Sequence, residues 1–125
     1  TNKYIAFYNN IGVIVYLETP LFKNYIDFLK SLSRIDYIWY NGPKNLDLYL
    51  TKLSRKFPQS KSIFDMVDIH FLRYKRAIKQ EPNRISFRKK YYKYLKIETQ
   101  LAKKANIIIA ISEVEKQFKT FIIVK

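Results

Sequence analysis

Short apolar runs alternate along this chain with segments whose apolar residues recur at helical spacing. The run Ile107–Ile111 is continuous, and the run Ser62–Val67 is interrupted only by Asp65. Nearly unbroken apolar strands are typical of parallel sheets that are buried on both faces. Alternation of such strands with helices predicts an α/β fold. We therefore expect a Rossmann-like parallel sheet with helices on both faces, in a single domain spanning residues 1–125.

The periodicity also places the individual elements. Strands are expected, in chain order, at Tyr4–Tyr8, Val13–Leu17, Ile35–Tyr40, Ser62–Val67, Ile107–Ile111 and Phe121–Val124. Helices are expected after the Thr19–Pro20 start signal, over Leu46–Leu53, through a basic region broken at Glu81–Asn83, and after the capping box Ser112–Glu115. Turns are expected at Asn9–Gly12 and Asn41–Pro43.

Composition excludes several classes of chemistry. The chain has no cysteine and one histidine, so a disulfide framework, thiolate catalysis and a zinc site are all disfavoured, and no metal is expected. With two glycines it cannot carry a dinucleotide-binding fingerprint. No apolar run approaches the roughly 20 residues that span a bilayer, and the start shows no signal-peptide pattern. The expected location is the cytoplasm, and peripheral attachment to the inner face of the membrane is left open.

Positive charge is concentrated in one part of the chain. The net charge is +14, and residues 71–104 hold 12 basic and two acidic residues. Basic and aromatic residues are mixed in Arg88–Lys96, a composition that suits nucleic acid or an anionic membrane surface. The competing interpretation is a solvated helix face in a protein whose lysine content reflects AT-rich codons. We favour the second interpretation, and nucleic acid is not an expected partner.

The candidate site follows the strand predicted at Ser62–Val67. Asp65, Asp68 and His70 lie where that strand ends, and ligands of open α/β sheets bind beyond the carboxyl ends of strands. A carboxylate beside an imidazole fixes its tautomer and raises its basicity, so Asp68 and His70 could orient a hydroxyl or accept its proton. The alternative is that Asp68 caps the following helix and His70 is a packed surface residue.

Other residues are expected at the same edge. Arg73 and Arg76 follow at helical spacing and suit the phosphate groups of a substrate, or merely solvate a helix face. Gly42, Ser112 and Glu113 follow neighbouring strands, although capping is the simpler role for Ser112. Glu98 falls near an apolar stripe, which leaves two options: it pairs with a buried partner, or it caps the sheet edge near the site.

The residues Asp65–Arg73, followed by Glu98 and then Leu101–Glu113, resemble the N-terminal domain of retaining GT-B glycosyltransferases of the large bacterial capsule and lipopolysaccharide group. There an Asp-x-x-Asp-x-His stretch follows a strand, a helix carries a Glu, and a strand ends in Ser-Glu. The resemblance covers roughly residues 36–125, and Asn106 stands where the family usually has Asp. The first 18 residues resemble nothing known to us.

This resemblance implies a function. The N-terminal domain of such enzymes binds the acceptor, and a C-terminal domain binds the nucleotide-sugar donor without a metal. His70 matches the histidine that faces the donor sugar, and Ser112 and Glu113 would line the cleft. We thus expect an acceptor-side domain that binds a glycan or lipid-linked acceptor. As a fragment, it would be inactive without its donor-binding domain. It would hold no cofactor itself, and the nucleotide sugar would bind the full enzyme. The alternative is a non-enzymatic basic module that binds nucleic acid or anionic membrane.

Overall fold

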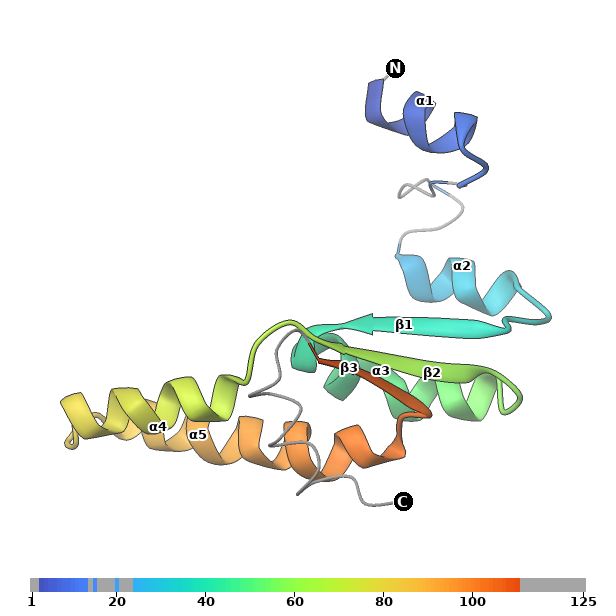
Figure 1. Cartoon of the computed structure of the whole chain (residues 1–125). Helices are drawn as coiled ribbons and strands as arrows, with labels where there is room; N and C mark the ends of the chain where they lie inside the picture. The colour runs from blue at the N-terminus through green and yellow to red at the C-terminus, as the bar shows by residue number, and fades with distance from the viewer. Residues whose placement is uncertain (1–2, 14, 16–19, 21–23, 111–125) are drawn as a thin grey trace. The chain divides into compact units, whose positions relative to one another are not determined.

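The computed structural model describes residues 3–13, 15, 20 and 24–110 of the chain (Figure 1). It consists of two compact units, residues 1–33 and residues 34–125. The predicted strand at 121–124 and the predicted capping box at 112–115 lie outside the described residues, as do the predicted helix cap Thr19 and positions 14, 16 and 17 of the strand expected at 13–17.

The described residues of the first unit form two short helices. Helix α1 spans Lys3–Asn10 and helix α2 spans Tyr25–Ser31. The prediction of a strand at Tyr4–Tyr8 was therefore wrong. Tyr4, Phe7 and Tyr8 recur at helical spacing as well as forming a continuous apolar run, and the run was given too much weight. Gly12, at φ +81°, follows α1 in the turn that the sequence predicted.

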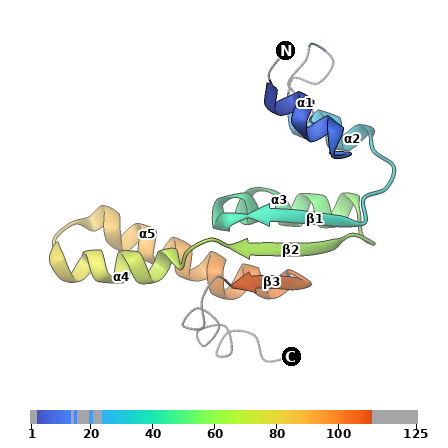
Figure 2. The ribbon, with the colours of Figure 1, turned by 45° about the horizontal axis from the view of Figure 1, so that its top comes forward.

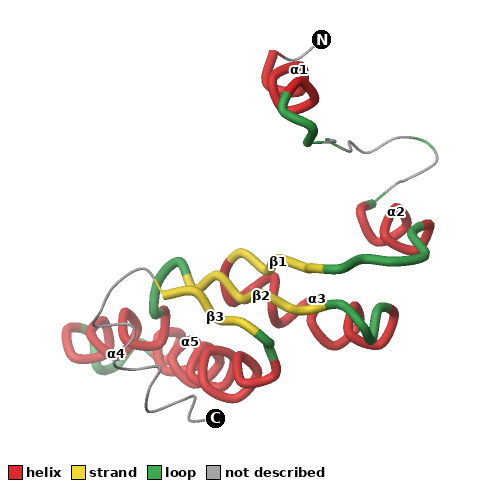
Figure 3. The backbone as a smooth tube through the Cα atoms, turned by 45° about the vertical axis from the view of Figure 1, so that its right-hand side comes forward, coloured by secondary structure: helices red, strands yellow, loops and turns green. Residues whose placement is uncertain are grey.

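A three-stranded parallel sheet forms the centre of the second unit. Its strands are β1 (Tyr37–Asn41), β2 (Lys61–Met66) and β3 (Ile107–Ala110), in the order β1-β2-β3 (Figure 3). The register pairs Asn41 with Asp65, and Asp65 with Ile109. The carboxyl ends of the three strands consequently meet at one edge, as the sequence predicted. This confirms the α/β class and the parallel sheet.

Burial alternates along β2, so the two faces of the sheet differ. Ser62, Phe64 and Met66 are buried, together with Tyr40 of β1. This face packs against helix α3 (Gly42–Lys56), whose Leu46, Leu50 and Leu53 are also buried. Burial raises the pKa of Tyr40 to about 12, which keeps its phenol neutral within this core. The opposite face carries Trp39, which is exposed.

Two helices form a hairpin beyond the carboxyl ends of the strands. Helix α4 (His70–Gln80) runs outward and helix α5 (Ile85–Lys96) returns beside it (Figures 1 and 2). The break between them falls at the predicted Glu81–Asn83. Helix α5 continues into a π-helical turn, η1 (Ile97–Leu101), and a 3-10 turn, η2 (Ala102–Lys104). The turn η1 packs against α3 and returns the chain to β3.

Within residues 34–110, which the structure describes, α3 and η1 lie on the same side of the sheet (Figure 2). The second helical layer predicted from the sequence is not among these elements. No helix within the described residues is long and apolar enough to cross a membrane.

Asn106 joins β3 to β2. Its side-chain Oδ1 accepts hydrogen bonds from the backbone N–H of Ser62 (2.8 Å) and from the Ser62 hydroxyl (3.0 Å). The N–H of Asn106 donates in return to Ser62 Oγ (3.1 Å). Both bonds made by the Asn106 side chain use its oxygen as an acceptor, and a carboxylate oxygen could accept them equally well. The structural role of position 106 thus accommodates either Asn or Asp.

Candidate functional site

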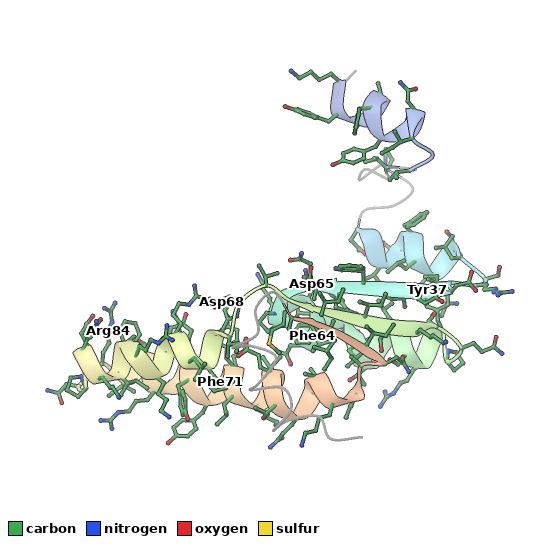
Figure 4. The ribbon with its side chains drawn as sticks, viewed as in Figure 1. Tyr37, Phe64, Asp65, Asp68, Phe71 and Arg84 are labelled. Carbon is green, nitrogen blue, oxygen red and sulfur yellow. The ribbon has the colours of Figure 1, made fainter. Side chains whose placement is uncertain are left out.

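The site is built where the chain leaves β2 and enters α4. The strand ends at Met66 and the helix begins at His70, with Asp68 in the connection between them (Figure 4). The residue that precedes the helix is Ile69, whose apolar side chain cannot cap, and it is buried. The first amides of α4 therefore need hydrogen-bond acceptors from elsewhere in the fold.

Glu98 supplies those acceptors from the π-helical turn η1. Its Oε1 accepts a hydrogen bond from the backbone N–H of His70 at 2.9 Å, and its Oε2 accepts one from the N–H of Phe71 at 3.0 Å. Glu98 is fully buried, with 0% of its surface exposed. A carboxylate at a helix N-terminus is also favoured by the helix dipole. A residue 28 positions away thus performs the capping role that the sequence had assigned to Asp68 as an alternative.

The same carboxylate holds the imidazole of His70. Nδ1 of His70 lies 2.9 Å from Oε1 of Glu98 and 3.0 Å from the backbone oxygen of Asp68. A carbonyl oxygen can only accept, so Nδ1 carries the hydrogen and donates to both oxygens. In the neutral form of the ring, this tautomer leaves Nε2 as the basic nitrogen. This carboxylate-imidazole pair is the arrangement that orients a histidine for proton transfer or for binding a hydroxyl.

The environment of Glu98 opposes its ionisation. Desolvation by burial raises the pKa of this carboxyl group. Hydrogen bonds from the amides of Phe71 and His70, together with the charge of a protonated His70, lower it in part. Burial has the larger effect, so the pKa remains above its ordinary value.

The imidazole of His70 also packs against aromatic rings. The ring of Tyr94 stacks on His70 with centroids 4.8 Å apart, and Tyr74 stacks on Tyr94 at 5.6 Å. Phe87 follows at 6.1 Å from Tyr74. These rings alternate between α4 and α5, so the packing that joins the two helices also restricts rotation of His70. With 19% of its side chain exposed, the imidazole remains in contact with solvent.

Asp68 is positioned differently from the sequence-based expectation. Its carboxylate does not contact the imidazole; it lies 3.6 Å from the guanidinium of Arg73, and both side chains are at least half exposed. Asp68 contributes to His70 only through its backbone oxygen. The expected pairing of the Asp68 carboxylate with the imidazole is corrected: Glu98 is the carboxylate partner. Exposed ion pairs of this kind contribute little stability, so a ligand can separate the two groups at little cost. Because both side chains are also exposed, Asp68 and Arg73 are accessible to a ligand.

Asp65 lies on the other face of the sheet from Phe64 and Met66. Its Oδ2 accepts a hydrogen bond of 3.3 Å from the indole N–H of Trp39 on the neighbouring strand. Gly42 occupies the sharp turn from β1 into α3 at φ +75°, a conformation that glycine adopts without strain. The side-chain amide of Asn45 closes this turn by donating to the backbone oxygen of Asn41 (2.9 Å). Asp65 and Gly42 thus both lie at the carboxyl edge of the sheet, and their role toward a substrate stays a prediction.

The remaining predicted site residues have different outcomes. Arg76 is exposed on α4, which is compatible with either interpretation of that residue. Ser112 and Glu113 lie outside the described residues. Glu98 was noticed in the sequence as a charge near an apolar stripe, and the structure combines the two options: Glu98 pairs with His70 and also caps the start of α4 beside the sheet edge. Within the described part of the chain, no group of three His, Asp or Glu side chains is arranged to hold a metal ion.

Comparisons with known proteins give no independent assignment. No model of a known protein family matches the chain, and neither a curated protein nor a solved structure matches it. A function for this domain therefore has to be inferred from the geometry of the site and from the order of its motifs.

Proposed function

We propose that this domain forms the acceptor side of a glycosyltransferase active site, with a nucleotide-sugar-binding domain completing the cleft. The observation that carries the proposal is the His70–Glu98 pair at the carboxyl end of β2. The order of Asp65–Arg73, Glu98 and Leu101–Glu113 in the sequence supports the same assignment. The acceptor is a glycan or a lipid-linked sugar.

The chemistry assigned to each group follows from its surroundings. In the transfer, the bond between the anomeric carbon and the donor phosphate breaks, and a bond to the acceptor oxygen forms. The nucleoside diphosphate leaves, and the acceptor hydroxyl transfers its proton to the departing phosphate oxygen. Nε2 of His70 would accept a hydrogen bond from a sugar hydroxyl, with Nδ1 fixed by Glu98. Asp68 would accept a second hydroxyl, and the guanidinium groups of Arg73 and Arg76 would bind acceptor phosphate.

The test uses the intact gene product that carries this domain. Sugar transfer from a panel of radiolabelled nucleotide sugars to glycan and lipid-linked acceptors is measured for the wild type, His70→Gln and His70→Ala. We expect transfer by the wild type and a loss of kcat of about 100-fold in both variants. Thr51→Ala, an exposed substitution on α3, is the control and should retain full activity. Normal turnover by His70→Ala, or no transfer from any donor, would overturn the proposal.

A second candidate function rests on the outer part of the hairpin. Ile85 and Tyr92 on α5 are 68% and 67% exposed, and Arg88, Lys89 and Lys93 lie on the same helix. Exposed apolar side chains among basic residues suit an anionic membrane surface, where each Lys or Arg contributes about 1 kcal/mol. This candidate predicts salt-sensitive sedimentation with vesicles containing phosphatidylserine, weakened in Ile85→Ser. Absence of vesicle binding at low salt would exclude it, while binding to RNA alone would favour nucleic acid.

A further inference from the structure

A concave surface lies on the helical side of the domain and shares no residue with the His70 site. It is a cavity of about 290 Å³ between α3 and the helix formed by α5, η1 and η2. The residues that line it are Asp47, Lys93, Lys96, Ile97, Gln100, Leu101 and Lys104. Its volume is just below the range for small-molecule sites, which is about 300–1,000 Å³, so only a small ligand would fit.

The lining residues share one face of a single helix. Positions 93, 96, 97, 100, 101 and 104 recur every three or four residues, and Asp47 faces them from α3. The π-helical turn η1 supplies three of these residues. Such turns are uncommon and are found frequently at functional sites. Here η1 directs Glu98 to the amides of α4 while Ile97 lines the cavity.

The electrostatics of the cavity favour an anion. Lys93, Lys96 and Lys104 surround it, and Asp47 is the single acidic residue in its lining. None of the three lysines forms an ion pair with a carboxylate of the described residues, in contrast to Arg34, Arg73 and Arg84. Several unpaired cations around a concavity with low-dielectric walls concentrate positive potential within it.

We propose that this cavity binds a small phosphorylated sugar. The phosphate would take charge-assisted hydrogen bonds from Lys93 and Lys96. Asp47 would accept a hydrogen bond from a sugar hydroxyl, Gln100 would bind a second one, and the carbon skeleton would lie over Leu101. This assignment is independent of the proposed glycosyltransferase function, because it shares no residue with the His70 site.

Binding is tested on the intact chain with glucose 1-phosphate as the probe, followed by the amide resonances of residues 93–104 in NMR spectra. We expect saturable shifts below about 10 mM and affinity reduced about tenfold or more in Lys93→Gln/Lys96→Gln. Lys75→Gln/Lys79→Gln removes the same charge from exposed positions on α4 and should change the affinity less than twofold. Asp47→Ala removes the hydroxyl acceptor and should lower the affinity for glucose 1-phosphate relative to that for inorganic phosphate.

Three results would overturn the assignment. One is the absence of saturable shifts at that concentration. Another is an equal loss of affinity in the two double variants, which would indicate general attraction to a basic surface. The third is binding only to vesicles that contain phosphatidic acid, which would identify a lipid phosphate rather than a free sugar phosphate as the ligand. Circular dichroism of each variant verifies that the fold is retained.

Discussion

The base and the tip of the α4–α5 hairpin both contain a carboxylate beside a cationic or protonatable side chain, but in opposite environments. At the base, Glu98 is fully buried and bonds two backbone amides and an imidazole. At the tip, Glu81 lies 3.1 Å from Arg84, and about half of each side chain is exposed. Figure 4 labels Asp68 and Phe71 near the base and Arg84 toward the tip. The distances in the two pairs are similar, but one pair is buried and the other is half exposed. We therefore expect the two pairs to contribute very differently to stability.

The largest effect is expected from Glu98→Ala. The substitution leaves the amides of His70 and Phe71 without their acceptor at a buried helix start. It also removes one of the two acceptors of the Nδ1–H of His70. We expect the free energy of unfolding, measured by urea denaturation, to fall by about 3–5 kcal/mol. A loss below about 1 kcal/mol would show that water replaces the carboxylate easily, and the contrast between base and tip would then disappear.

A pH experiment sharpens the same point. The pKa of Glu98 is raised in the folded state from its ordinary 4.5, so the native protein retains a proton that the unfolded chain releases. Stability contributed by Glu98 is therefore fully present below about pH 4.5 and decreases as the pH rises through the raised pKa.

The comparison is made in a His70→Gln background, which removes the histidine titration and one of the influences that lower the pKa of Glu98. Adding Glu98→Gln should abolish the decrease. The measurement is the difference in unfolding free energy between these two proteins from pH 4 to pH 8. A difference that stays constant over that range would contradict the raised pKa.

The aromatic contacts permit a matched pair of substitutions. Tyr94 is partly buried between His70 and Tyr74, whereas Tyr92 on the same helix is 67% exposed. Tyr94→Ala should lower the free energy of unfolding by about 2 kcal/mol, and Tyr92→Ala by less than about 1 kcal/mol. Thermal denaturation of the two variants provides the measurement. Equal losses would mean that the stack near His70 adds nothing beyond covering surface.

The smallest effect is expected at the tip. Glu81→Ala removes the carboxylate from its exposed pair with Arg84. Such pairs are screened by solvent and cost side-chain entropy, so the free energy of unfolding should change by less than about 0.5 kcal/mol. Raising the salt concentration should reduce even that difference. If Glu81→Ala lowered the free energy of unfolding as much as Glu98→Ala, the expected difference between the base and the tip of the hairpin would be contradicted.

Much of the second unit was predictable because its elements carry strong local signals. The strands near Ile35–Tyr40, Ser62–Val67 and Ile107–Ile111 and the helix that ends before Pro58 were all found close to their predicted positions. The break at Glu81–Asn83 was found as well. The helix at Lys3–Asn10 was not, because its run Tyr4–Tyr8 is apolar throughout and satisfies both strand and helix periods.

The candidate site was only partly predictable. The sequence placed Asp68 and His70 at the end of a strand, and it identified Glu98 as an unusual charge. It could not identify Glu98 as the partner of His70, since 28 residues separate them and the π-helical turn that aligns them depends on the packing of η1 against α3. The nearer carboxylate, Asp68, was chosen because alternation at the strand end would orient it with His70, and it instead lies beside Arg73.

The sequence alone determined the α/β class, the parallel sheet and the edge at which polar residues collect, because apolar periodicity and helix-breaking residues act locally. Only the tertiary structure decided which carboxylate holds the imidazole and which lysines surround a common cavity. Those arrangements depend on where helices meet after the core has packed. Burying the carboxyl group of Glu98 is unfavourable, and hydrogen bonds to the amides of His70 and Phe71 compensate that cost. No local sequence pattern encodes those hydrogen bonds, because their partners are far apart in the chain.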